Sequence, residues 1–137
     1  MKKLDALIGG PPLYFCHADF KPEGSLNKTF SAPVTEISIF VFEGGPPEDY
    51  LDDVAKWSKL VDEEKPDGYL GMSAGVTYEE LEKDGVKGKA VVLTLGWQSI
   101  ANHEAFRETE SFSKNLHLLL SSAKSTDMGH VAFMQAL

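Results

Sequence analysis

The sequence predicts an α+β domain of the ferredoxin-like class, in which residues 35–134 follow the order β-α-β-β-α-β and form an antiparallel sheet with both helices on one face. Three observations predict this class. Four segments are rich in β-branched or aromatic residues, helical stripes of apolar residues lie between them, and the connections are short enough for one compact unit. The length of 137 residues is that of a single domain.

The first strand and the first helix follow from local composition. Residues 35–42 (TEISIFVF) are β-branched and aromatic, which favours a strand. The turn at residues 44–47 (GGPP) then opens a helix, which ends before residues 66–68 (PDG). The apolar residues of this helix fall on one stripe: Tyr50, Leu51, Val54, Trp57 and Val61.

The second half of the pattern repeats the strand and helix signals. The expected elements, in order, are a strand at residues 69–77, an acidic connector at 78–88, a strand at 90–97, a helix that begins after Ser99 and reaches Leu120 with or without a break, a polar loop at 121–127 and a closing strand at 128–134. Ser99 is a residue type that caps helices, and His103 and Phe106 follow on the inward side of that helix.

The N-terminal part divides the chain into two regions: residues 1–33 form an extension with one strand and a linker, and residues 34–137 form the ferredoxin-like domain. The sequence predicts a frayed helix end at residues 1–10, a strand at residues 13–20 (LYFCHADF) and a loop at residues 21–33. The aromatic content of the strand is too high for a free tail, so we expect it to pair with a sheet edge, of its own chain or of a partner.

Composition excludes several classes of protein. Thirteen Lys and Arg against 21 Asp and Glu give a net charge of −8, which argues against nucleic acid and against an anionic membrane as partners. A single cysteine, Cys16, excludes an internal disulfide and a Cys-rich zinc site. The N-terminus lacks the features of a signal peptide, and no apolar run approaches the ~20 residues that span a bilayer. We therefore expect a soluble, cytoplasmic protein.

Strand alternation sorts the side chains onto two faces. The face expected toward the helices is aliphatic and carries Ile37, Ile39, Val41, Leu70, Met72, Val76, Val91, Leu93, Leu95, Val131 and Phe133. The opposite face is expected to carry Ser38, Phe40, Phe42, Tyr69, Ser73, Val92, Thr94, His130, Ala132 and Met134. This second set is too apolar for bulk water, so a second copy of the sheet is expected to cover it, which gives a homodimeric barrel around a partly apolar cavity.

Several segments resemble one known superfamily. Residues 95–107 (LGWQSIANHEAFR) carry a W-x-S-x-x-x-H-x-x-F strand-to-helix signature that resembles dimeric α+β barrels. Residues 34–36 (VTE), 74–80 (AGVTYEE) and 106–109 (FRET) are similar to fungal proteins of the antibiotic-biosynthesis-monooxygenase-like superfamily, and the likeness covers roughly residues 11–137. It implies a dimeric α+β barrel. The superfamily holds cofactor-free oxygenases of aromatic polyketides, haem-degrading enzymes, isomerases, decarboxylases, cyclases and members without known activity.

The candidate site residues come mainly from the sheet face that is expected to point away from the helices and to line the barrel cavity. His130 is the expected catalytic base, because histidine titrates near neutrality, although a hydrogen-bonded core histidine is the structural alternative. The remaining expected substrate-binding residues are Ser38, Phe40, Phe42, Tyr69, Ser73, Val92, Thr94, Met134, Trp97 and His17. Trp97 and His103 are more typical of helix–sheet packing. Scattered histidines predict no metal, and no nucleotide-binding loop is present, so no cofactor is expected.

Three functions remain open from the sequence. The first is a cofactor-independent enzyme of secondary metabolism, an oxygenase, decarboxylase or cyclase that acts on an aromatic or polyketide-like small molecule. The second is a non-catalytic or stress-related barrel that binds a small apolar ligand. The third is a structural remnant whose dimer surface is its whole purpose.

Overall fold

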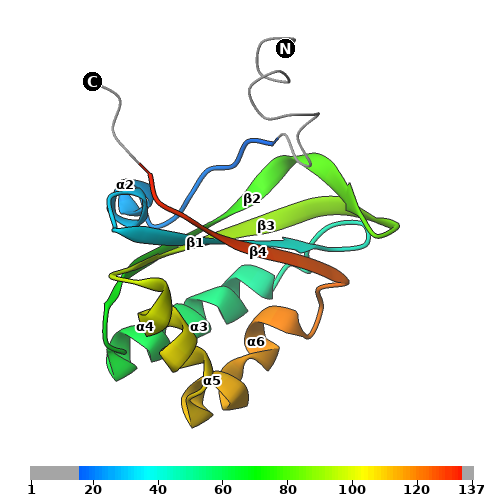
Figure 1. Ribbon diagram of the computed structural model, residues 1–137. Coiled ribbons are helices and arrows are strands. Elements are labelled where there is room, and N and C mark those ends of the chain that lie inside the picture. Colours follow the sequence, from blue (N-terminus) through cyan, green and yellow to red (C-terminus); the bar gives the residue numbers. More distant parts are fainter. Residues whose placement is uncertain (1–15, 134–137) are drawn as a thin grey trace, which may run out of the picture.

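The computed structural model describes residues 16–133 and shows an antiparallel sheet with a layer of helices on one face (Figure 1). The elements are α2 (Ser25–Phe30), β1 (Val34–Val41), α3 (Tyr50–Glu64), β2 (Tyr69–Lys83), β3 (Val86–Trp97), α4 (Ile100–Arg107), α5 (Glu110–Asn115), α6 (His117–Leu120) and β4 (Ser125–Val131). The strands lie in the order β2-β3-β1-β4. This topology confirms the predicted ferredoxin-like α+β class.

β1 lies in the middle of the sheet, and its register decides which residues share a face. It pairs with β3 from Val34 opposite Trp97, and with β4 so that Glu36 lies opposite His130. Residues directly opposite one another in an antiparallel pair project to the same side. The register therefore places Glu36 and His130 together on one face of the sheet.

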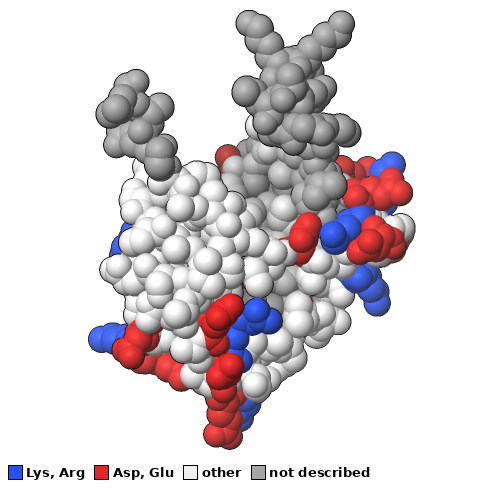
Figure 2. Space-filling view, in the orientation of Figure 1, with Lys and Arg blue, Asp and Glu red and all other residues white. Residues whose placement is uncertain are grey.

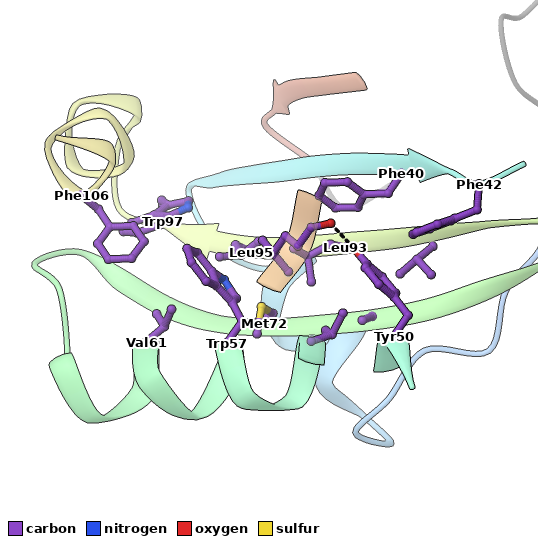
Figure 3. Packing of buried hydrophobic residues seen from close by; sticks show 14 residues of the cluster. Phe40, Phe42, Tyr50, Trp57, Val61, Met72, Leu93, Leu95, Trp97 and Phe106 are labelled. Carbon is purple, nitrogen blue, oxygen red and sulfur yellow. Dashed lines mark hydrogen bonds between the residues drawn. The ribbon is translucent and has the colours of Figure 1, made fainter. Parts of the chain in front are cut away.

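The main core lies between the sheet and the helical layer (Figure 3). Four residues of the predicted stripe of α3 are buried there, since Tyr50, Val54, Trp57 and Val61 are each at most 6% exposed. The fifth, Leu51, was predicted wrongly, because it lies on the outer side of the helix and is 44% exposed. The Tyr50 hydroxyl donates to the Leu119 carbonyl at 2.8 Å, which ties α6 to α3. The predicted second long helix is present as three short helices, α4, α5 and α6, which close one side of this core.

The acidic connector expected at residues 78–88 is instead the tip of a long β2–β3 hairpin. Asp84 and Gly85, with φ of 54° and 79°, form its two-residue turn. Two consecutive residues with positive φ match the right-handed twist of the flanking strands, and Asp-Gly is a preferred pair at this position. The prediction was wrong because the acidic composition of the segment outweighed this turn signal.

The N-terminal region also differs from its prediction. The loop expected at residues 21–33 contains α2, which packs against the sheet on the face away from α3 (Figure 1). Gly96 permits this close approach, because a Cβ there would lie 2.9 Å from the Ala32 Cβ. The described part of the expected strand pairs with the chain's own β2 edge, where Ala18 lies opposite Thr77 and Tyr78 N–H donates to the His17 carbonyl at 2.8 Å. Residues 1–15 lie outside the described part, and the two-region division stays a prediction.

The predicted faces were wrong for β1, for β4 and for the first two residues of β2. Pairing places Ser38 opposite Leu93 and Phe40 opposite Val91, so both project toward the helices, while Ile39 packs on the other face. The residues predicted on the wrong face are Ile37, Ser38, Ile39, Phe40, Val41, Phe42, Tyr69, Leu70, His130, Val131 and Phe133. The reason is that β1 is apolar at both parities, since helices cover one face and α2 with residues 16–21 covers much of the other.

The surface charge is unevenly distributed. Figure 2 shows an uncharged area over α2, β1 and β4, while acidic and basic side chains gather around the β2–β3 hairpin and the helical layer. Val131 and Phe133 are each 41% exposed, and Phe133 stacks on Phe30 of α2. Among residues 16–133, no helix has the length and the apolar content that crossing a bilayer would require.

Candidate functional site

The candidate site is a cavity of about 190 Å3 between the sheet and the helical layer. Its walls are mostly apolar, and its polar groups gather on β1, α4 and β4. The side chains that line it are Glu36, Ser38, Phe40, Trp57, Leu93, Leu95, Trp97, His103, Phe106, Arg107, Phe112, Leu116, Leu119, Leu120, Thr126, Asp127 and Met128. An apolar cavity with a few converging polar groups is the usual form of a small-molecule site.

A buried carboxylate and a buried imidazole form the polar end. Ser99 caps α4 by accepting a hydrogen bond from Asn102 N–H at 3.1 Å, and this start directs His103 toward the sheet. The His103 ring stacks on Trp97 with centroids 5.2 Å apart. Its Nε2 lies 2.7 Å from Glu36 Oε1, and the two residues are 4% and 6% exposed. The pair is therefore shielded from solvent.

His130 extends this pair toward solvent. Its Nε2 lies 2.7 Å from His103 Nδ1. His130 is half-buried and does not line the cavity, so it forms the outer end of a Glu36–His103–His130 chain. Burial lowers the pKa of His130, and the adjacent His103 lowers it further, although Glu36 and Glu104 act in the opposite direction. His130 is therefore neutral at pH 7 and able to accept a proton.

The hydrogen bonds within the Glu36–His103–His130 chain determine which of its atoms is available as a base for a bound molecule. Both nitrogens of His103 are engaged, one by Glu36 and one by His130. Glu36 Oε2 accepts only a long hydrogen bond, of 3.3 Å, from Ser38 Oγ. Glu36 lines the cavity and His130 does not, so Glu36 Oε2 is the atom of the three groups that has lone pairs to spare for a bound molecule. The two imidazoles connect Glu36 to the surface.

The predicted site residues are divided between the two faces of the sheet. Ser38, Phe40 and Trp97 line the cavity. Phe42 lies in the core against Tyr50.

Tyr69 packs edge-on to Trp97, and burial, with a contribution from Asp62, raises the pKa of its phenol. The side chain that was expected on the outer face thus belongs to the core beneath the helices, because an irregularity in the β2–β3 pairing lies between Tyr69 and Gly71.

Other predicted site residues lie away from the cavity. On the opposite face, Thr94 Oγ1 is hydrogen-bonded to Thr29 Oγ1 at 2.8 Å and to Ser73 Oγ at 3.1 Å, and Val92 shares that face. These hydroxyls satisfy one another beneath α2. His17 is exposed and lies 2.7 Å from Glu79. Met134 lies outside the described residues.

Sequence reasoning missed Glu36 as a functional residue and treated His103 as packing. The signal for Glu36 was present: it is the carboxylate of an otherwise apolar strand and shares its parity with Ser38, Phe40 and Phe42. Burial of a carboxylate is costly unless it is hydrogen-bonded, so such a residue calls for a partner. That partner, His103, is 67 positions away and could not be identified from spacing.

A second hollow, of about 660 Å3, lies between α3 and β2 beside residues 19–22. Its lining residues include no histidine, so it offers no comparable acid–base chain. In the part of the chain that the structure describes, no three His, Cys, Asp or Glu side chains converge as a metal site would require. The hydrogen-bonded carboxylate and imidazole groups thus lie at the smaller cavity.

Comparisons with known proteins identify the fold. No protein-family model matches the sequence, and no curated protein does. The chain is similar in structure to At3g17210 from Arabidopsis thaliana (TM-score 0.60, 14% identity, 77% of this chain and 99% of that one). It is also similar to SnoaB, a cofactor-independent oxygenase from Streptomyces nogalater (0.53, 14%, 76% and 95%), and to a hydroxynitrile lyase from Passiflora edulis (0.54, 11%, 78% and 98%). The protein thus shares one α+β fold with enzymes of different activity.

Proposed function

We propose that this protein is a cofactor-independent enzyme of secondary metabolism that removes a proton from an aromatic or polyketide-like small molecule, as an oxygenase, decarboxylase or cyclase. The observation that carries the proposal is the Glu36–His103–His130 chain at the polar end of an apolar cavity. The fold shared with a cofactor-independent oxygenase supports it, as does the resemblance to the antibiotic-biosynthesis-monooxygenase-like superfamily.

Glu36 is the general base of the proposed reaction. Its Oε2 takes the proton of a phenol or enol, and the electron pair spreads over the conjugated substrate. His103 donates its Nε2–H to Glu36 Oε1, and His130 contacts His103 Nδ1, so the two imidazoles hold the carboxylate in place while Glu36 keeps the proton and returns it to the product or to solvent. Positioned general bases accelerate reactions by about 10²–10⁴-fold. The apolar wall keeps water away from the carbanion-like intermediate. Ser38 also lines the cavity, and once Glu36 Oε2 is protonated, its hydroxyl can turn from that oxygen and donate to the developing oxyanion.

The fate of the intermediate distinguishes the reaction types. In an oxygenase, the carbanion-like carbon of a ring methylene bonds to O2, and the resulting peroxide anion takes up the proton from Glu36 to give a hydroperoxide. Loss of water then leaves a ketone, so that one CH2 and one O2 give one C=O and one H2O. O2 is the oxidant in this sequence. A decarboxylase or cyclase uses the same proton transfers without O2.

A deuterium-exchange experiment tests the proposed base without knowledge of the natural substrate. Resorcinol is incubated with the protein in deuterated buffer, and loss of its ring C–H signals is followed by NMR. We expect acceleration by the wild type and loss of that acceleration in Glu36→Gln and His103→Gln. The matched controls are Glu108→Gln and His117→Gln, because both residues are exposed. Tight binding without acceleration would instead indicate the non-catalytic, ligand-binding function.

A further inference from the structure

We infer that the substrate of this site bears a carboxylate, and that the guanidinium of Arg107 binds this carboxylate where the cavity opens to solvent. The inference rests on the proposed function only in taking this cavity as the substrate site. It narrows the substrate class from aromatic or polyketide-like molecules in general to acids of that class, and it assigns a substrate-binding residue outside the Glu36–His103–His130 chain.

Arg107 lies at the mouth of the cavity, which is the part of its lining that solvent reaches. The exposed lining residues are Arg107 at the end of α4, Leu120 of α6, and Thr126 and Met128 of β4. Arg107 follows His103 by four positions, so the two side chains lie one turn apart on the same side of the helix. The guanidinium is therefore accessible to a molecule that enters the cavity.

The charge of Arg107 has no carboxylate partner within the described chain. Glu104, Glu108 and Glu110 flank it in the sequence and are exposed, yet none of the ion pairs among residues 16–133 includes Arg107. This is notable because the chain has 21 Asp and Glu and only this one arginine. Its positive charge contributes to the lowered pKa of His130, so the guanidinium lies near the outer end of the Glu36–His103–His130 chain.

The two carboxylates that line the cavity do not neutralise Arg107. Glu36 is engaged by His103 at 2.7 Å. Asp127 lies opposite Ile39, which packs on the other face of the sheet, so the Asp127 carboxylate projects away from the helical layer. On that side it lies 3.4 Å from Lys83 Nζ. The guanidinium thus remains available for an anionic group of a ligand.

A carboxylate is the anion that fits this mouth best. The planar guanidinium presents parallel N–H groups that can donate to both oxygens of a carboxylate. A phosphate monoester carries about two negative charges at pH 7 and would meet a single arginine. Leu120 and Met128, which are 39% and 42% exposed, add apolar surface to the same mouth. Such a surface suits the carbon skeleton of an aromatic acid.

The charges at the two ends of the cavity set the direction in which the acid binds. Glu36 is ionised when it acts as the base, and two carboxylates repel each other more strongly in an apolar cavity than in water. The ligand carboxylate therefore stays at Arg107, and the phenol or enol that loses its proton faces Glu36 Oε2. One ion pair at the mouth thereby orients the reacting group at the buried end.

Two probes of nearly the same shape test the ion pair. 2,4-Dihydroxybenzoate and 2,4-dihydroxybenzamide differ by one negative charge. In calorimetric titrations at low salt, we expect the wild type to bind the benzoate about fivefold more tightly than the benzamide, the size of an exposed ion pair with good geometry. Arg107→Gln should abolish this preference and leave the affinity for the benzamide almost unchanged. The matched control is Lys114→Gln, which removes the same charge from an exposed residue of α5 outside the cavity lining and should keep the preference.

Salt provides a second measurement, made on the wild type alone. The preference for the benzoate should disappear between about 0.01 M and about 1 M salt, because the Debye length falls from about 30 Å to about 3 Å. Equal affinity of the wild type for the two probes at low salt would overturn the inference. An equal loss of preference in Arg107→Gln and Lys114→Gln would also overturn it, since it would show a response to net charge and not to a contact.

The two proposals fail in different ways. If the benzoate is preferred through Arg107 but resorcinol exchange is not accelerated, the proposed function is wrong while the carboxylate site stands. If exchange is accelerated and the two probes bind equally, the carboxylate site is wrong while the proposed function stands.

Discussion

Glu36→Gln is the substitution that separates the role of Glu36 in the proposed chemistry from its role in the fold. It keeps the shape of the side chain and removes its charge. Glu36 is 6% exposed, and its Oε1 lies 2.7 Å from His103 Nε2. The amide oxygen of Gln can still accept from that nitrogen, so the hydrogen bond persists in a weaker form. The amide cannot take a proton from a bound molecule.

The expected magnitudes point in opposite directions for activity and stability. Loss of the base should slow resorcinol exchange by about 10²–10⁴-fold. Burying a carboxylate costs several kcal/mol, and a hydrogen bond to a charged group returns only about 1.5–3 kcal/mol of this. The neutral amide avoids most of that penalty. We therefore expect the free energy of unfolding to stay the same or to rise by up to about 2 kcal/mol.

Two assays on the same variant check this reasoning. Exchange of resorcinol measures activity, and urea unfolding at pH 7 measures stability, with Glu108→Gln as the exposed control. An increase of about 2 kcal/mol would raise the melting temperature by several degrees in a domain of this size. A loss of more than about 2 kcal/mol would show that Glu36 is mainly structural. Exchange within threefold of wild type in a folded variant would show that it is not the base.

Three further outcomes are expected. Because the pKa of His130 is lowered in the folded state, the unfolded state binds more protons than the folded state below the ordinary value of 6.5. The contribution of His130 to the free energy of unfolding should therefore be complete above pH 6.5 and be lost as pH falls through its folded pKa. His130→Gln should make the pH dependence of urea unfolding shallower in that range. Gly96→Val should destabilise the protein by about 1–3 kcal/mol in thermal unfolding, because its side chain would push α2 off the sheet; unchanged stability would show that α2 packs loosely. If the uncharged area around Val131 and Phe133 forms the proposed homodimer, light scattering should give about twice 15.0 kDa and Val131→Asp should halve it, whereas a wild-type monomer would contradict the dimer.

Part of the candidate site could be predicted from the sequence. Trp97, Ser38 and Phe40 were expected at a small-molecule site and do line the cavity, although on the other face of the sheet. Residue type alone made His130 the expected base. The contact between His130 and His103 could not be predicted, because the local sequence around one histidine does not indicate where the other lies in the fold.

Local sequence determined the class of the fold. Residues 35–42 and 90–97 are rich in β-branched, aromatic and other apolar residues, and the stripe from Tyr50 to Val61 has helical spacing. Such signals arise within a few neighbouring residues. Together they were sufficient for the β-α-β-β-α-β order. The Asp84-Gly85 turn was equally local and was overlooked.

Only the tertiary structure decided which face of the sheet carries the site. β1 is apolar at both parities because each of its faces is buried, one by the helical layer and the other largely by α2 and the N-terminal segment, so alternation carried no information about direction. The register of β1 with β4 then placed Glu36 beside His130, and α4 brought His103 between them. These three residues meet through pairing and packing, which are long-range interactions, whereas sequence patterns report only the local environment of each residue.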